Sequence, residues 1–347
     1  MDRRSMRAVV MVSAVLALGA CRAVLGIDED VPLLPDGADG GPGGGDGATG
    51  DGAGGDASSD GASTDAAEDG GTVPVDRRYA VWPLPDPRPL LSNYDLTPDT
   101  VTDKTTGLVW QRQEPTPVSA SYSAASTYCD DLDLAGKQDW RLPTRIELLT
   151  ILDYGQPSNV LNKTVFPDSP QAGGTIAWTS SLSLLRAKLT DRFLVDLDLA
   201  LVTLSGNDQL SNLYRCVRGG PTTSPANRYA VTAETARDVR TGVTWQRKAF
   251  PGIQGFDAAK ASCAALSIEG ASGWRLPTVR ELVTLIDEAR EVVPMVPTIF
   301  DAGPKARYWS QTIRANPATA AYAVDMDTAN VHQEQIASAE MAVRCVR

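Results

Sequence analysis

Apolar side chains recur along this chain with two different periods, and each pattern occurs twice. Residues 122–134 carry them three or four positions apart, and the segment that begins at Phe256 repeats this spacing. The period predicts an amphipathic helix in each place. Residues 193–199 and 322–327 alternate instead between apolar and polar, which is typical of a strand with one buried face. The helical positions are Tyr122, Ala125, Cys129 and Leu132, matched by Phe256, Ala259, Cys263 and Leu266.

A second helix is predicted after each of two Pro-Thr pairs. Thr144 and Glu147 have the spacing of a capping box, in which the Thr side chain caps the helix and the Glu side chain accepts from the backbone of the cap. Thr278 and Glu281 repeat this spacing. Two helices followed by alternating strands indicate an α+β domain with a mostly antiparallel sheet.

The patterns recur because the chain contains one long block twice. Trp-Gln-Arg at 110–112 returns at 245–247, Trp-Arg-Leu-Pro-Thr at 140–144 returns at 274–278, and Arg-Cys-Val-Arg at 215–218 returns at 344–347. Such a period is too long for a solenoid and indicates tandem duplication of a whole domain. We place copy 1 at residues 76–219 and copy 2 at residues 220–347. A chain of this size can bury its own core, so we expect two beads with separate cores.

The N-terminal segment has the features of an export signal. Three arginines precede an apolar run from Ala8 to Leu18, which is too short to span a bilayer. Leu-Gly-Ala before Cys21 resembles the lipobox of bacterial lipoproteins, although an ordinary signal peptide with an incidental Cys is the alternative. The resemblance implies removal of residues 1–20, lipidation of Cys21 and a durable membrane anchor. Arg22 rather than Asp after the lipidated residue favours the outer membrane, on its periplasmic or surface face.

Residues 21–75 are predicted to be a disordered tether. From Asp36 to Gly71 the chain is almost wholly Gly, Asp, Ala and Ser, which cannot bury enough apolar surface to fold. Residues 1–75 contain four basic and thirteen acidic side chains, a net charge of −9 within the total of −11. The two copies are therefore nearly neutral, which argues against nucleic acid as a partner.

The remaining cysteines predict one disulfide in each copy. Once Cys21 is lipidated, two cysteines remain per copy, and in an exported protein such an even set is typical of disulfides. Duplication selects the pairing within each copy, Cys129 with Cys216 and Cys263 with Cys345. A zinc site is excluded because two cysteines and the distant His332 cannot supply four ligands.

Several motifs together resemble a known family. They are Thr-Gly-Leu-Val-Trp-Gln at 106–111, the Cys of the first helix, Trp-Arg-Leu-Pro-Thr-x-x-Glu-Leu from 140, Ala-Trp-Thr-Ser-Ser at 177–181, and the closing Arg-Cys-Val-Arg. This set resembles the C-terminal domain of the Legionella collagen-like adhesin over residues 79–219 and 229–347. A more distant similarity is to formylglycine-generating sulfatase-modifying domains. The resemblance implies two tandem C-type-lectin-like α+β domains of a kind widespread in bacterial envelope proteins.

The repeated motif supplies the first candidate site residues. Trp140 and Trp274 precede Arg-Leu-Pro between two helices, where a core position is more common than a ligand contact. Arg141 and Arg275 require carboxylate partners. We expect each to be buried and paired with an acid of its own copy. The repeated acids are Glu147 and Asp196 in copy 1, and Glu281 and Asp325 in copy 2.

A second candidate is a weak calcium site. Asp196-x-Asp198 and Asp325-x-Asp327 could supply oxygen ligands. The polar face of an alternating strand explains the same spacing without a metal. We therefore predict no metal and no other cofactor.

The residues argue against catalysis. His332 is the only histidine, so a Ser-His-Asp arrangement cannot be shared by the copies. The reactive cysteine pair of sulfatase-modifying enzymes is missing, because the late Cys of each copy is assigned to a disulfide. We expect an envelope-anchored lipoprotein with two non-catalytic binding beads, for surface adhesion or for a glycan or other envelope polymer. A structural envelope protein that binds a protein partner is the alternative, and a sulfatase-modifying-like enzyme is a third reading.

Overall fold

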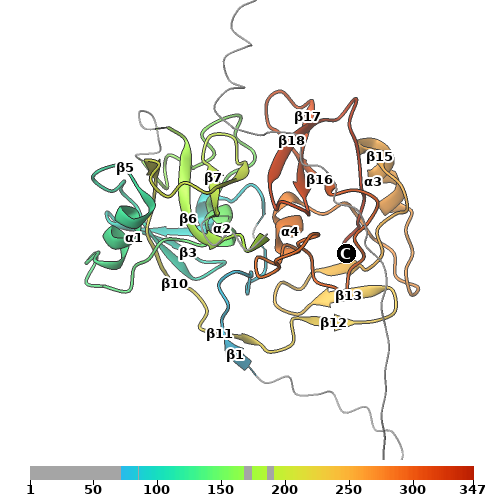
Figure 1. Cartoon of the computed structure of the whole chain (residues 1–347), viewed down its shortest axis with the longest axis horizontal. Coiled ribbons are helices and arrows are strands. Elements are labelled where there is room, and N and C mark those ends of the chain that lie inside the picture. Colours follow the sequence, from blue (N-terminus) through green and yellow to red (C-terminus); the bar gives the residue numbers. More distant parts are fainter. Residues whose placement is uncertain (1–71, 85, 168–173, 186–190) are drawn as a thin grey trace, which may run out of the picture. The chain divides into compact units, whose positions relative to one another are not determined.

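The computed structural model describes residues 72–84, 86–167, 174–185 and 191–347 (Figure 1). The predicted signal peptide, Cys21 and the tether up to residue 71 lie outside these ranges. Residues Thr72–Pro74, the end of the predicted tether, form strand β1 and pair with β11, Thr223–Pro225.

Each copy begins with a small antiparallel sheet. In copy 1 the strand order is β10-β4-β3-β2, and in copy 2 it is β12-β13-β14. The strands of copy 1 are β2 (Tyr94–Leu96), β3 (Thr100–Asp103), β4 (Leu108–Gln111) and β10 (Val217–Gly219). Those of copy 2 are β12 (Tyr229–Val231), β13 (Thr235–Asp238) and β14 (Thr244–Gln246).

The largest sheet has eight strands and contains strands from both copies, in the order β16-β17-β18-β8-β7-β6-β9-β5. Copy 1 supplies β5 (Ser119–Ala120), β6 (Ile176–Leu182), β7 (Arg192–Asp196), β8 (Val202–Ser205) and β9 (Asn212–Leu213). Copy 2 supplies β16 (Arg307–Ile313), β17 (Ala320–Asp325) and β18 (Val331–Gln335). All its neighbouring pairs are antiparallel except β6 with β9. A two-stranded sheet joins β15 (Gln254–Gly255) to β19 (Glu340–Met341).

The helices are few and short. The predicted amphipathic helices are α1 (Tyr122–Asp130) and α3 (Phe256–Ala264), and the capped helices are α2 (Arg145–Leu148) and α4 (Val279–Thr284). Single 3-10 turns occur at η1 (Leu91–Asn93) and η2 (Leu149–Ile151). Both predicted capping boxes are complete, with both bonds present. A mostly antiparallel sheet with a few short helices confirms the coarse α+β prediction.

The expectation of two separate cores is wrong. The largest cluster of buried apolar residues includes side chains of both copies, among them Phe193 and Val202 of copy 1 and Tyr322 and Val331 of copy 2. Smaller clusters surround the cysteines of each copy. The copies join because β8 and β18 pair antiparallel at Val202 and Val331, so each covers the open edge of the other.

Candidate functional site

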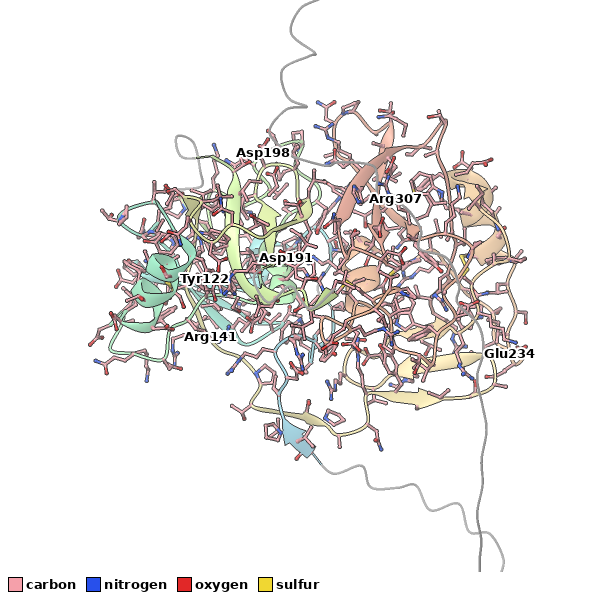
Figure 2. The ribbon with its side chains drawn as sticks, viewed as in Figure 1. Tyr122, Arg141, Asp191, Asp198, Glu234 and Arg307 are labelled. Carbon is pink, nitrogen blue, oxygen red and sulfur yellow. A yellow bond between two sulfur atoms is a disulfide. The ribbon has the colours of Figure 1, made fainter. Side chains whose placement is uncertain are left out.

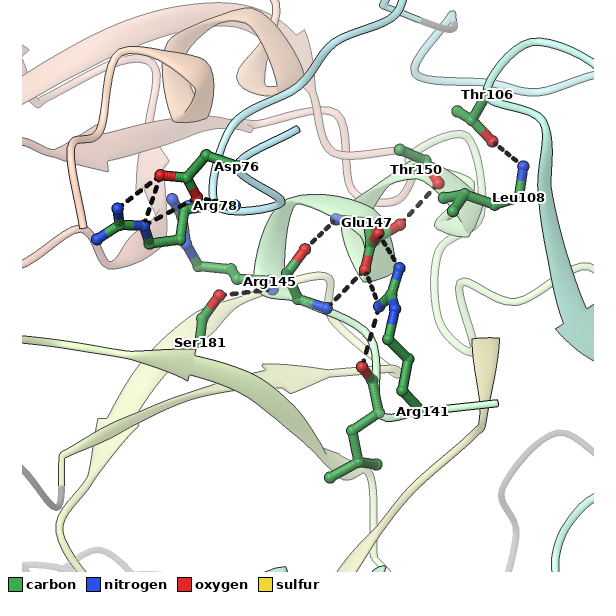
Figure 3. Close-up of polar contacts among 11 residues, drawn as sticks. Asp76, Arg78, Thr106, Leu108, Arg141, Arg145, Glu147, Thr150 and Ser181 are labelled. Atoms are coloured by element: carbon green, nitrogen blue, oxygen red, sulfur yellow. Dashed lines mark hydrogen bonds and ion pairs between the residues drawn. The ribbon is translucent and has the colours of Figure 1, made fainter. Parts of the chain in front are cut away.

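The repeated Trp-Arg-Leu-Pro-Thr segment lies beside the closing Arg-Cys-Val-Arg segment of its own copy. Arg141 exchanges backbone hydrogen bonds with Val217, at 3.0 and 2.9 Å, and Arg275 does the same with Val346, at 2.9 Å both ways. This contact holds the segment against the closing Arg-Cys-Val-Arg. It also aims each arginine side chain toward the following short helix, as Figure 3 shows for copy 1.

Each of these arginines forms a bidentate ion pair with the glutamate of the capping box, through both terminal nitrogens of its guanidinium. In copy 1, Arg141 donates to the two carboxylate oxygens of Glu147 at 2.7 and 2.6 Å, and the same carboxylate accepts from the backbone of Thr144 at 2.8 Å. In copy 2, Arg275 donates to Glu281 at 2.8 and 2.6 Å. We call this unit of Arg, Thr and Glu the clasp. The predicted pairing within each copy is confirmed, and of the two predicted acids the partner is the capping-box Glu rather than the strand Asp.

The predicted burial of the arginines is only partly right. The side chain of Arg141 is 22% exposed and that of Arg275 is 43% exposed, whereas those of Glu147 and Glu281 are 2% and 8% exposed. The hydrogen bond to Glu281 raises the pKa of Arg275, against the opposing effect of partial burial. The carboxylate is the buried partner because it must also reach the helix N-terminus, while the arginine can leave one face in water.

The two motif tryptophans belong to the core. Trp140 and Trp274 are both buried, and their indole N–H groups donate to the carbonyls of Lys137 and Ala271 at 3.0 and 2.9 Å. Because the polar atom of each ring is already satisfied within its own copy, the ring packs rather than presents a ligand contact.

Both predicted disulfides are present. Cys129 bonds to Cys216 and Cys263 bonds to Cys345, with Cα–Cα distances of 5.4 and 5.6 Å. Each bond ties the first helix of a copy to its closing Arg-Cys-Val-Arg segment, within the apolar cluster that includes the motif tryptophan.

The four candidate calcium ligands lie at the ends of two strands, where they close turns. Asp196 accepts from the backbone of Asp198 at 2.8 Å, and Asp325 accepts from that of Asp327 at 2.9 Å. Asp198 accepts from the backbone of Asn159 at 2.7 Å. Over the described ranges, no group of three or more His, Cys, Asp or Glu side chains has an arrangement that could hold a metal ion.

The family comparison matches the same two blocks that carry these features. A family model described as the Lcl C-terminal domain matches residues 99–218 and 234–347. The chain belongs to the Lcl C-terminal domain family. The match confirms both the resemblance and the tandem arrangement, because the family model fits two successive blocks of the chain. Each block includes one clasp and one disulfide. Comparison with curated proteins finds no match. No helix in the described part of the chain is long and apolar enough to cross a membrane.

The residues that join the two Lcl C-terminal domains were not foreseen. Arg145 of copy 1 donates through Nε to Glu288 of copy 2 at 2.8 Å, and both side chains are fully buried. The guanidinium also lies 5.1 Å from the centre of the Phe193 ring. Burial raises the pKa of Glu288, although the neighbouring Arg145 opposes this rise.

An arginine of copy 2 makes a similar contact with copy 1. Arg280 is buried, donates to the carbonyls of Asp86 and Leu152, and stands 5.7 Å from the centre of the Tyr154 ring. Tyr154 in turn packs edge-on against Tyr322 of copy 2 at 4.9 Å. We call this set of contacts, together with the pairing of β8 and β18, the seam.

The seam relates the two Lcl C-terminal domains by an approximate two-fold axis. Equivalent strands, β8 and β18, pair with each other antiparallel, and each first-turn arginine reaches into the other copy. This is the geometry of an isologous dimer within one chain. The sequence contained one signal of this contact, because the two capped helices differ in their first turns. When the copies are aligned, Arg145 corresponds to Val279, and Arg280 corresponds to Ile146.

Proposed function

We propose that this chain is an exported lipoprotein whose two Lcl C-terminal domains form one non-catalytic binding unit. The observation that carries the proposal is that both copies belong to this family. Their motifs resemble the C-terminal domain of a collagen-like adhesin. Adhesion to a surface, or binding of a glycan or other envelope polymer, is the function that this relationship favours.

The repeated arginines and glutamates pair with each other, which supports a non-catalytic role. The residues most suggestive of an active site, Arg141 and Arg275, are held by Glu147 and Glu281 in the clasp. A carboxylate whose oxygens are occupied by a bidentate arginine and a backbone N–H is not free to contact a substrate.

The two disulfides support export. Cystines persist in oxidising compartments, and each bond here joins the same two elements in its copy. The lipobox-like segment before Cys21 and the acidic tether suggest an anchor in the outer membrane with the domains held away from it.

A C-type-lectin-like architecture is the fold that we propose for each copy. It is supported by the pairing of an early strand with the last one, β4 with β10, and by the disulfide from the first helix to the final strand. A crystal structure whose copies superpose on such domains in the same strand order would test it, and a different strand order would reject it.

The seam changes how such a protein would bind. Two beads on a flexible linker could engage two ligands independently and gain avidity from their linker. Two domains that share a sheet present their surfaces at one fixed spacing, which favours repeated groups along a polymer.

A protein partner remains the second candidate because apolar side chains are exposed in adjacent positions. Leu90 and Leu91 are 67% and 47% exposed, and Val292 and Val293 are 63% and 56% exposed. Neighbouring exposed apolar side chains can mark a protein interaction site.

A glycan array run with the full chain tests the proposal. We expect saturable retention on a restricted set of glycans or envelope polymers, and loss of this retention when both disulfides are reduced. Retention on no glycan or polymer, together with capture of a defined envelope protein that depends on Val292 and Val293, would favour the second candidate instead.

The anchor has its own test. Changing Cys21→Ser should abolish labelling by a fatty-acid analogue and leave the protein unprocessed or released from the membrane fraction. Unchanged labelling and membrane partition in this variant would reject the lipoprotein assignment while leaving the binding unit untouched.

A further inference from the structure

A cavity of about 340 Å³ lies between the two copies, beside the seam. Copy 1 contributes residues that follow β6, Asp191 directly before β7 (labelled in Figure 2), and Leu204 within β8. Copy 2 contributes the turn after β17 and an exposed loop. Its polar residues are Ser183, Asp191, Asp327 and Thr328, and its apolar wall includes Leu204 and Val293. The cavity therefore combines two carboxylates and two hydroxyls with an aliphatic surface.

Three polar side chains of this cavity, those of Ser183, Asp191 and Asp327, lack a partner among the described residues, whereas the hydroxyl of Thr328 accepts from the backbone N–H of Asn330 at 3.4 Å. No hydrogen bond or ion pair reaches the carboxylates of Asp191 and Asp327 from any residue that the structure describes. Ser183 is 1% exposed, and its hydroxyl makes no hydrogen bond within the same ranges. A buried hydroxyl is normally satisfied, so an unsatisfied one that lines a cavity points to a missing polar ligand.

The pseudo-symmetric position in copy 2 shows what kind of group fits. Ser183 directly follows β6, and Arg314 directly follows the equivalent strand β16. Their backbone N–H groups make matching bonds, Ser183 to the carbonyl of Asp191 and Arg314 to that of Ala320. Copy 2 thus has an arginine at the chain position where copy 1 has the small hydroxyl of Ser183 beside an open cavity.

We propose that this cavity binds an organic cation on an aliphatic stem, such as the side chain of a lysine or arginine from a partner molecule. Asp191 and Asp327 would face the charge, Ser183 and Thr328 would accept from its N–H groups, and Leu204 and Val293 would pack on the stem. Burial and the neighbouring Asp325 both raise the pKa of Asp327, which a bound cation would offset. The inference goes beyond the proposed function and holds whether or not the protein binds glycans.

Titration of the full chain with Nα-acetyl-arginine N-methylamide, followed by saturation-transfer NMR, tests the proposal. The citrulline analogue is the neutral control of nearly the same shape. We expect saturable binding of the arginine probe and binding of the citrulline probe that is weaker by about tenfold or more. Equal binding of the two probes, or no saturable binding of either, would overturn the proposal.

Two variants locate the site. Asp327→Asn should weaken binding of the arginine probe by about tenfold or more, and Ser183→Arg should abolish it by supplying the internal cation found in copy 2. Asp198→Asn changes the equivalent turn residue of copy 1 and should leave binding unchanged. Thermal melts establish that each variant is folded. Folded Asp327→Asn and Ser183→Arg chains that bind like the unchanged protein would contradict the assignment.

Discussion

At the scale of single residues, the same clasp stands in two different environments. The carboxylates of Glu147 and Glu281 are both nearly buried, but Arg141 keeps about half the exposure of Arg275. An ion pair in contact with water is screened and contributes little, whereas a partly buried one leaves an uncompensated charge when one partner is removed. The two copies therefore allow the effect of burial on one motif to be measured within a single chain.

Replacement of Arg141 with Met should destabilise the protein more than replacement of Arg275 with Met. We expect the first change to lower the free energy of unfolding by up to about 3 kcal/mol, since Glu147 keeps only its backbone donor. Water already screens the more exposed Arg275, so its loss should cost less. Urea denaturation of both variants measures the difference. If Arg141→Met has no effect on stability, the clasp is not structural.

At the scale of elements, the two copies meet through strands that both contain and through a buried ion pair that occurs once. Strands β8 and β18 pair at the equivalent residues Val202 and Val331, whereas Arg145 of α2 bonds to Glu288 after α4. Arg145 and Glu288 are 143 positions apart and meet without access to water. A buried ion pair compensates its desolvation only with good geometry. Burial raises the pKa of Glu288 by more than the neighbouring Arg145 lowers it, so the pKa lies above its ordinary value.

The raised pKa of Glu288 predicts a pH dependence of stability. The folded chain keeps this proton at pH values where the unfolded chain, with a pKa near 4.5, has lost it. The free energy of unfolding should therefore fall as pH rises from 4.5 through the folded-state pKa of Glu288, and then level off.

Glu288→Gln removes this titration and supplies the control. The free energy of unfolding of the unchanged chain, minus that of the variant, should decrease over the same pH range. Urea denaturation at a series of pH values gives both curves. Parallel curves would mean that Glu288 titrates alike in the folded and unfolded chains.

At the scale of the whole molecule, the described part of the chain from residue 72 onward has one large core shared by both copies. A smaller apolar cluster surrounds the disulfide of each copy. The seam buries side chains of both copies in one cluster and completes one sheet. The unfolding of one copy would expose the edge strand and the apolar face of the other. Independent unfolding of two beads is therefore not expected.

Calorimetry should show a single transition for both copies. The calorimetric and van't Hoff enthalpies should agree, as they do for a cooperative unit. In Arg141→Met the same single transition should move to lower temperature, rather than split into one shifted and one unshifted peak. Two resolved transitions would show that the seam contributes little to folding.

Loss of either disulfide should lower the common melting temperature. The bonded cysteines are 87 and 82 residues apart, so each bond restricts a long loop and stabilises by up to about 4.5 kcal/mol on the chain-entropy model. Alanine pairs at Cys129 and Cys216, and at Cys263 and Cys345, should have effects of similar size. Because the copies share a core, each double variant should melt as one unit.

The sequence by itself determined the features that are local or repeated. The capping boxes depend on residues three positions apart, and the helical and alternating patterns depend on short periods, so neighbouring residues suffice to predict them. The disulfide pairing followed from duplication, because equivalent cysteines must bond alike in two copies of one fold. The partner of Arg141 could be narrowed to two acids by the same comparison.

Only the tertiary structure decided how the two copies meet. The ion pair of the seam uses residues in which the copies differ, since Arg145 corresponds to Val279 in copy 2, so the repeat that revealed the domains does not predict this contact. The exposure of Arg275 and the cavity lined by Ser183 and Asp327 likewise depend on which surfaces are covered. Burial is a property of the assembled chain, since it arises from contacts between residues more than a hundred positions apart.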